Sequence, residues 1–140
     1  MNGTGTIDLG MLGEARVLSA PEHDSIHVSG VIPADLELFR DHFPDFPVVP
    51  GVLSLELMKK AADIFWHSLP GTAGTALRLR EVESAKFAAY LKPGDAWEVK
   101  LVFSPEGLER IPCHGKLVHE GRAAVSASLV FECIKTRQPN

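Results

Sequence analysis

Apolar and polar residues alternate along much of the chain, a period of two that is typical of half-buried β-strands. The clearest early case runs from Ile26 to Ile32, and residues 16–18 are a candidate partner for it. The second half of the chain consists of strand-like stretches and turns, with strands predicted at 77–82, 85–91, 97–103, 113–119 and 122–134. Lys92-Pro93-Gly94-Asp95 and Glu120-Gly121 are the turn signals between them.

One segment has the period of a helix instead. It begins after Gly51, runs from Val52 to about His67, and is stopped by Pro70 and Gly71. Its apolar residues cover far more than one stripe, which indicates a helix largely wrapped by other structure. The polar residues fall on one narrow seam, formed by Glu56, Lys59, Lys60, Asp63 and His67.

Three prolines, Pro44, Pro47 and Pro50, precede this helix at every third position of an otherwise apolar stretch. Proline fixes φ and lacks an N–H donor, so neither a helix nor a central strand fits there. We expect a stiff, extended loop that ends at Gly51.

The order of elements is strands, one long helix, then about four antiparallel strands, with no internal repeat. This order predicts an α+β fold in which a curled antiparallel sheet surrounds a central helix. A length of 140 residues fits one domain, spanning 1–140, and we expect the tail from Thr136 to Asn140 to be frayed.

Charge and cysteine content narrow the function. The net charge of −4 provides no basic stripe for a phosphate backbone, so nucleic acid is not an expected partner. Cys113 and Cys133 are too few for a disulfide scaffold or a repeated zinc motif, and we interpret them as reduced thiols. Neither a signal peptide nor a membrane-length apolar run is apparent, so we expect a cytoplasmic protein.

Three residues around the proline loop could support acid–base chemistry. His42 lies where rigid backbone would hold an imidazole against an apolar surface, as a general base requires. Gly51 opens the helix, where free N–H groups and the helix dipole favour negative charge. Glu56, in the second turn, could act as an acid if burial raises its pKa.

Each of these residues also has a purely structural interpretation. His42 could pack and donate to a carbonyl, Gly51 could serve only the turn, and Glu56 could pair with Lys60 at i+4. The other histidines show no ligand-like spacing, so no metal site is predicted. A phosphate loop, a serine elbow and a cysteine nucleophile are also missing from the sequence.

The segment HFPDFPVVPGVLSLE, residues 42–56, resembles the signature GHFPGxPxxPGVLxxE of the 3-hydroxyacyl-[acyl carrier protein] dehydratases of the FabZ/FabA type. IPADLELF before it is similar to the approach strand of that family, especially of its aryl polyene branch. AKFAAYLKPGDAWEV after the helix is similar to the family's strand, turn and strand. The resemblance covers residues 25 to 103.

This resemblance implies a hotdog fold, with homodimers or trimers of dimers that form their active sites between subunits. It implies that His42 and Glu56 are catalytic, that the Gly51 N–H holds the thioester carbonyl, and that Phe43, Pro50 and Val52 line the substrate site. The implied reaction converts 3-hydroxyacyl thioesters of acyl carrier protein or coenzyme A into trans-2-enoyl thioesters in fatty-acid or polyene biosynthesis. It uses no cofactor or metal, and the apolar helix and sheet would line an acyl tunnel.

Three positions depart from the family pattern. Asp41 and Asp45 stand in place of glycines beside His42, and Lys60 replaces a usual glutamine. Two alternatives therefore stay open: a hotdog acyl-thioester hydrolase and a non-catalytic acyl-binding protein. Docking of an acidic carrier would need a local basic patch, for which the sequence offers Arg78, Arg80, Lys86 and Lys92.

Overall fold

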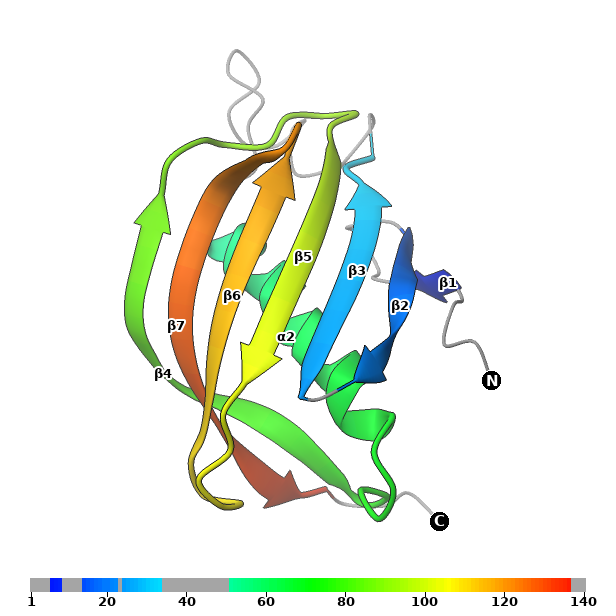
Figure 1. Ribbon diagram of the computed structural model, residues 1–140, viewed down its shortest axis with the longest axis vertical. Helices are drawn as coiled ribbons and strands as arrows, with labels where there is room; N and C mark the ends of the chain where they lie inside the picture. Colours follow the sequence, from blue (N-terminus) through cyan, green and yellow to red (C-terminus); the bar gives the residue numbers. More distant parts are fainter. Residues whose placement is uncertain (1–5, 9–13, 23, 34–50, 137–140) are drawn as a thin grey trace.

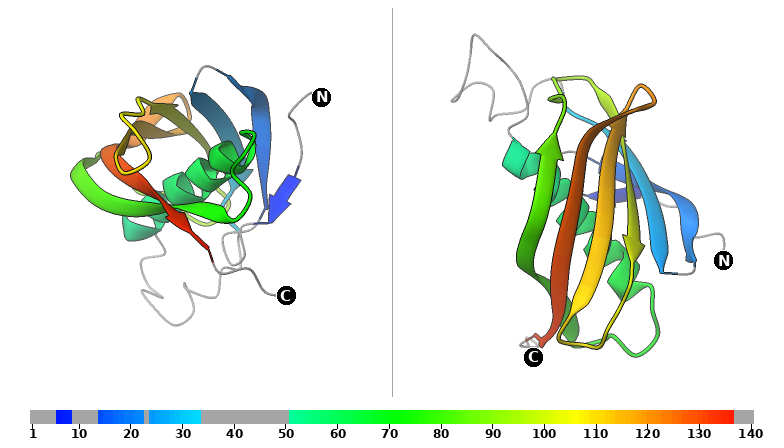
Figure 2. Two further views of the ribbon diagram at one scale, coloured as in Figure 1. Left: turned by 90° about the horizontal axis from the view of Figure 1, so that it is seen from below. Right: turned by 60° about the vertical axis from the view of Figure 1, so that its left-hand side comes forward.

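A long helix lies against the concave face of a curled antiparallel sheet (Figure 1). The structure is a computed structural model that describes residues 6–8, 14–22, 24–33 and 51–136. Along the chain the elements are β1 (Thr6–Asp8), β2 (Glu14–Glu22), β3 (Ser25–Val31), α2 (Gly51–His67), β4 (Thr75–Phe87), β5 (Ala96–Phe103), β6 (Ile111–His119) and β7 (Arg122–Lys135). The predicted α+β architecture is confirmed, and two further views show the sheet curving around α2 (Figure 2).

The sheet order explains which strands can meet other molecules. Within the described residues the strands follow the order β1-β2-β3-β5-β6-β7-β4, with every neighbouring pair antiparallel. The strand that follows the helix in sequence, β4, therefore lies at one edge of the described sheet, where its partner among the described strands is β7. Its other edge exposes backbone donors and acceptors to whatever lies beside it.

Two strands predicted at 77–82 and 85–91 are in fact one. The structure continues β4 from Thr75 to Phe87 through register shifts after Leu79 and Val82. Beyond Phe87 the prediction of a strand to residue 91 is wrong. The N–H groups of Ala88 and Ala89 both donate to the same carbonyl, at distances of 2.8 and 3.2 Å. Two successive donors on one acceptor break the alternation of a ladder, so the strand ends there.

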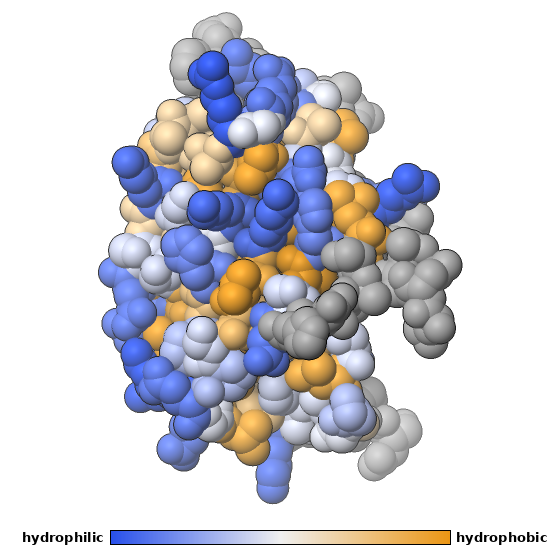
Figure 3. All heavy atoms as spheres, viewed as in Figure 1, coloured by the Kyte–Doolittle hydropathy of each residue, from blue (hydrophilic) through white to orange (hydrophobic). Residues whose placement is uncertain are grey.

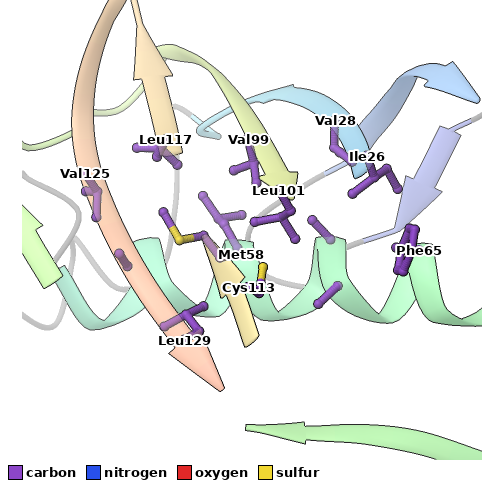
Figure 4. Packing of buried hydrophobic residues seen from close by; sticks show 14 of the residues in the cluster. Ile26, Val28, Met58, Phe65, Val99, Leu101, Cys113, Leu117, Val125 and Leu129 are labelled. Carbon is purple, nitrogen blue, oxygen red and sulfur yellow. The ribbon is translucent and has the colours of Figure 1, made fainter. Parts of the chain in front are cut away.

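The core lies between α2 and the concave face of the sheet (Figure 4). From the helix it takes Leu57, Met58 and Phe65, and from the strands it takes alternate residues such as Val99 and Leu101. Each fully buried aliphatic side chain of this kind contributes about 1.5–3 kcal/mol. The predicted apolar helix is confirmed, and its packing fixes both ends of α2 relative to the strands.

Two local features depend on glycine. The indole of Trp97, on β5, lies across Gly30 on β3, and a Cβ at Gly30 would overlap the ring. Glu120 and Gly121 have φ values of 52° and 77° and form the two-residue turn between β6 and β7. Positive φ at both positions is typical of hairpin turns whose twist matches the strands.

Candidate active site

The N-terminus of α2 lies beside the end of β4. Gly51 is the first residue of the helix, and the ring of Phe87 is so close that a Cβ at Gly51 would lie 2.8 Å from its Cε1 atom. The first N–H groups of a helix have no partner within it, and the helix dipole makes this end positive. The pair therefore combines N–H donors with an apolar ring, a setting suited to a polarised carbonyl on an apolar chain.

Glu56 follows Gly51 on the second turn and belongs to the predicted polar seam. The structure shows that Glu56, Lys59, Lys60 and Asp63 are half-buried, whereas His67 is exposed. No ion pair within 4.0 Å joins Glu56 to Lys60. The simple bridge that the i,i+4 spacing allowed is therefore not formed, and the carboxylate of Glu56 stays available for other partners.

Asp63 shows that the polar seam is partly shielded from solvent further along α2. Its Oδ1 atom is buried and has no hydrogen-bond partner. Burial raises the pKa of Asp63 above its ordinary value, although the charges of His67, Lys59 and Lys60 act in the opposite direction. The seam at Asp63 is therefore not an ordinary solvated helix face.

The second half of β4, beside the start of α2, is exposed, in contrast to the half-buried seam. Every residue from Glu81 to Tyr90 is exposed, on both faces of β4 and in the segment after it. Large apolar side chains are among them, with exposed fractions of 41% for Val82, 40% for Phe87 and 55% for Tyr90. A strand edge with exposed apolar side chains, next to a helix N-terminus, is the kind of surface that a partner covers.

Several residues expected at the site cannot be placed. His42, Phe43 and Pro50 lie outside the described residues, as do Asp41 and Asp45. The backbone of Val52 belongs to α2, but its side chain is outside the description. The structure thus brings Gly51 and Glu56 onto one helix and adds Phe87, while the position of His42 stays a prediction.

The other polar candidates lie elsewhere. His27 bonds to Glu98 at 2.5 Å on the convex face, and His114 lies 3.5 Å from the hydroxyl of Ser128. His119 sits at the end of β6, 2.6 Å from the carbonyl oxygen of Ala96. Among the described residues no three His, Cys, Asp or Glu side chains come together as a metal site. Cys113 and Cys133 are free thiols, and burial raises the pKa of Cys113 to about 12.

An apolar cavity of about 230 Å³ lies at the opposite end of the helix. It is formed largely by Phe65, Trp66, Leu69, Phe103 and Leu108. Trp66 comes fifteen residues after Gly51, a distance of about 22 Å along an α-helix. The cavity is therefore separate from the Gly51 end, and the expected acyl tunnel is not identified with it.

Comparison with known proteins places these features in a family. The family model described as ApeI dehydratase matches residues 18–121. A 3-hydroxyacyl-[acyl-carrier-protein] dehydratase FabZ from Lactobacillus helveticus is 33% identical over 97 residues, which cover 68% of this chain and 64% of that protein. The same enzyme from Teredinibacter turnerae is 28% identical over 120 residues, covering 82% of this chain and 81% of the relative.

Solved structures show the fold. A hypothetical thioesterase from Streptococcus pneumoniae, solved with coenzyme A, superposes with a TM-score of 0.70 at 12% identity, over 96% of this chain and 99% of that one. A thioesterase from Pseudomonas aeruginosa gives a TM-score of 0.64 at 19% identity, over 86% and 81% of the two chains.

The chain therefore has the hotdog fold, as the sequence predicted. Within that fold it belongs to the ApeI-like family of dehydratases, because the family model covers most of the chain. Among the described residues no helix is long and apolar enough to span a membrane.

The sequence did not identify Phe87 as a neighbour of Gly51. The two residues are far apart in the chain and meet only because β4 returns along the helix. The alternating pattern around Phe87 indicated a strand, but it carried no sign that this strand would lie at the edge of the sheet.

Proposed function

We propose that this protein dehydrates 3-hydroxyacyl thioesters, delivered on acyl carrier protein, to trans-2-enoyl thioesters in the biosynthesis of fatty acids or related polyenes. The observation that carries the proposal is the arrangement of α2 in a chain of the dehydratase family: the helix begins at Gly51, beside Phe87, and half-buried Glu56 lies on its second turn. The relatives named above act on acyl-carrier-protein thioesters, which supports the same carrier here.

In the proposed reaction His42 removes the proton on the carbon next to the thioester carbonyl. Electrons move onto the carbonyl oxygen, and the N–H of Gly51 stabilises that developing charge. When the carbon–carbon double bond forms, the 3-hydroxyl leaves with a proton from Glu56 as water. No electrons are exchanged with another molecule, so the scheme needs no redox cofactor, and it needs no metal because the thioester itself acidifies the neighbouring carbon.

The surroundings of Glu56 support its role as the acid. An acid at this position has to reach the leaving hydroxyl, which an ion pair with a neighbouring lysine would oppose. Glu56 is half-buried and makes no such pair with Lys60. We assign Phe43, Pro50 and Val52 to the wall around the reacting thioester, since they flank the catalytic positions in sequence.

The working unit in this proposal is a homodimer, or a trimer of such dimers. The free edge of β4 would pair with the same edge of a second copy and make one continuous sheet across the two protomers. This would cover the free backbone edge of β4, leave its convex face open, and bring His42 of one protomer to Glu56 of the other. Residues 1–140 act as one domain, and the proposed location is the cytoplasm, where Cys113 and Cys133 would stay reduced.

The carrier and the reaction can be tested together. Purified protein is given 3-hydroxyacyl groups on acyl carrier protein or on coenzyme A, with ultraviolet absorbance reporting the conjugated enoyl thioester and a thiol reagent reporting hydrolysis. The proposal predicts enoyl thioester without free thiol, and faster turnover on the carrier protein. Release of free thiol would instead indicate an acyl-thioester hydrolase. Tight binding with no turnover would indicate an acyl-binding protein.

A further inference from the structure

A row of basic side chains crosses the convex face of the sheet. The strand registers place His27 opposite Lys100, Lys100 opposite Lys116, Lys116 opposite Ser126, and Ser126 opposite Lys86. Directly paired residues of neighbouring strands share a face, so these five lie side by side on β3, β5, β6, β7 and β4. All three lysines are exposed, and Figure 3 shows hydrophilic side chains gathered over the central strands of this face. We call Lys86, Lys100 and Lys116 the lysine row.

The lysine row is not neutralised by the protein. None of its three ammonium groups makes an ion pair within 4.0 Å among the described residues. The carboxylate nearest in register, on Glu98, is held by His27 at 2.5 Å. Lys100 and Lys116 stand directly opposite each other, an arrangement that destabilises a sheet. In a chain with net charge −4, such a concentration of positive charge is not explained by folding.

Three arginines, in contrast to the lysine row, make polar contacts within the protein. Arg78 pairs with Glu132 at 2.8 Å, Arg80 donates to the carbonyl oxygen of Glu109 at 2.8 Å, and Arg110 pairs with Glu83 at 3.3 Å. Of the four basic residues that the sequence offered for a patch, two arginines are thus engaged within the protein. The register instead adds Lys100 and Lys116 to Lys86.

The surroundings of the row suit an anionic protein surface. Of the two neighbouring rows, one contains Glu98, which is bonded to His27, and the other contains no carboxylate, its members being Ser25, Val102, His114, Ser128 and Ser84. Lys86 is followed by Phe87, which contacts Gly51 on the other side of the sheet. The row therefore ends at the strand that borders the candidate active site, and Lys100 lies three strands away, about 15 Å across the sheet.

We infer that the lysine row is the docking surface for an acidic carrier protein that brings the acyl thioester. This inference rests on the proposed function and names the surface on which its partner sits. The carrier would place its acidic face over the row, near Lys86, so that its thioester arm passes the end of β4 toward Gly51. Opposite charges on two surfaces mainly raise the rate of encounter and fix the orientation, and salt weakens both effects.

The experiment compares the same acyl group on two carriers. Charge reversal in the double variant Lys100→Glu, Lys116→Glu is expected to raise KM for the acyl-carrier-protein substrate by roughly tenfold or more. The small N-acetylcysteamine thioester, which has no protein to dock, should keep its KM and kcat. The matched control is Lys135→Glu, an exposed lysine of β7 about 30 Å along the strand from the row.

Binding is also measured without turnover, using unacylated carrier protein at low and high salt. The inference predicts that wild-type binding weakens with salt and that the double variant loses this dependence. Unchanged carrier kinetics and binding in the double variant, with normal dehydration, would overturn the inference while the proposed function stands. The inference would also be overturned if the double variant bound the carrier protein normally and lost binding only to polyphosphate or to vesicles of anionic phospholipid. No dehydration of either thioester by the wild type would refute the proposed function instead.

Discussion

The ring of Phe87 at the end of β4 lies against the backbone of Gly51 at the start of α2, with its Cε1 atom 2.8 Å from the position of a Cβ on that glycine. This contact joins the strand at the edge of the sheet to the helix end that offers N–H donors. In the proposed dimer the same edge meets a second copy, so one contact would couple the start of α2 to the subunit interface.

Gly51→Ala tests the role of this close approach. The added methyl group would displace the ring of Phe87, which can move because 40% of it is exposed. Alanine suits a helix, so the free energy of unfolding should change by less than about 1 kcal/mol. Dehydration should fall by about 100-fold, because the N–H donor and its apolar neighbour would no longer fit the thioester.

The control is the same substitution with Phe87 replaced by alanine. If the crowded ring is what disturbs the site, Gly51→Ala should cost much less activity in the Phe87→Ala background. Full activity of the single Gly51→Ala variant would contradict the assignment of this helix end to the thioester.

A mixture of two inactive variants tests whether the site is shared. In the proposed dimer His42 and Glu56 of one site come from different protomers. His42→Ala and Glu56→Gln should each be nearly inactive, but a heterodimer of the two would keep one intact site. An equimolar mixture refolded together should therefore recover about a quarter of wild-type activity, if subunits combine at random. A mixture that remains inactive despite exchange of subunits would place both residues in one protomer.

Val82→Glu tests the β4 edge as the interface. Val82 is 41% exposed and lies between Glu81 and Glu83, so a third carboxylate would repel the same edge of a second copy. We expect the dimer dissociation constant to rise at least about tenfold, with the protomer still folded. Analytical ultracentrifugation measures this. Val102→Glu is the control, since Val102 is 53% exposed on β5, inside the sheet. Equal weakening by both substitutions would argue against β4.

The buried carboxyl of Asp63 predicts a pH dependence of stability. Its folded-state pKa lies above the ordinary value of 3.8, mainly because burial disfavours the charged form. Between these two pKa values the folded protein binds more protons than the unfolded chain, so this group lowers stability as pH rises through the interval. Asp63→Asn removes the charge. It should be more stable than wild type at pH 7, and the difference should vanish below pH 3.8.

Denaturant unfolding at several pH values measures the effect. A variant that is equally or less stable than wild type at neutral pH would mean that the Asp63 carboxylate is favourably paired in the folded protein. Asp24→Asn, at an exposed position, provides the comparison substitution.

Local pattern was enough to predict most of the fold. The strict alternation from Trp97 to Phe103 corresponds to β5, and the apolar run after Gly51 corresponds to α2, because both patterns report a buried face. The strand predicted to residue 91 failed beyond Phe87, where two N–H groups share one carbonyl. No local pattern encodes such an ending.

The sequence predicted the candidate site residues that belong to one motif, but not those that meet only through the fold. Gly51 and Glu56 belong to one motif, so their spacing in sequence fixes their spacing on the helix. The approach of Phe87 to Gly51 and the alignment of Lys86 with Lys116 and Lys100 depend on sheet order and register. Those are properties of strand pairing over long separations, which the sequence pattern leaves open.

Formation of the conjugated enoyl thioester is the most direct test of the central claim. The wild-type protein is supplied with a 3-hydroxyacyl-carrier-protein in one reaction and the matching trans-2-enoyl-carrier-protein in another, beside His42→Ala and Glu56→Gln. The account predicts that the wild type brings both reactions to the same equilibrium absorbance, and that each variant is slower by about 1,000-fold. Unaltered interconversion in folded His42→Ala, or no interconversion by the wild type with intact substrates, would contradict it.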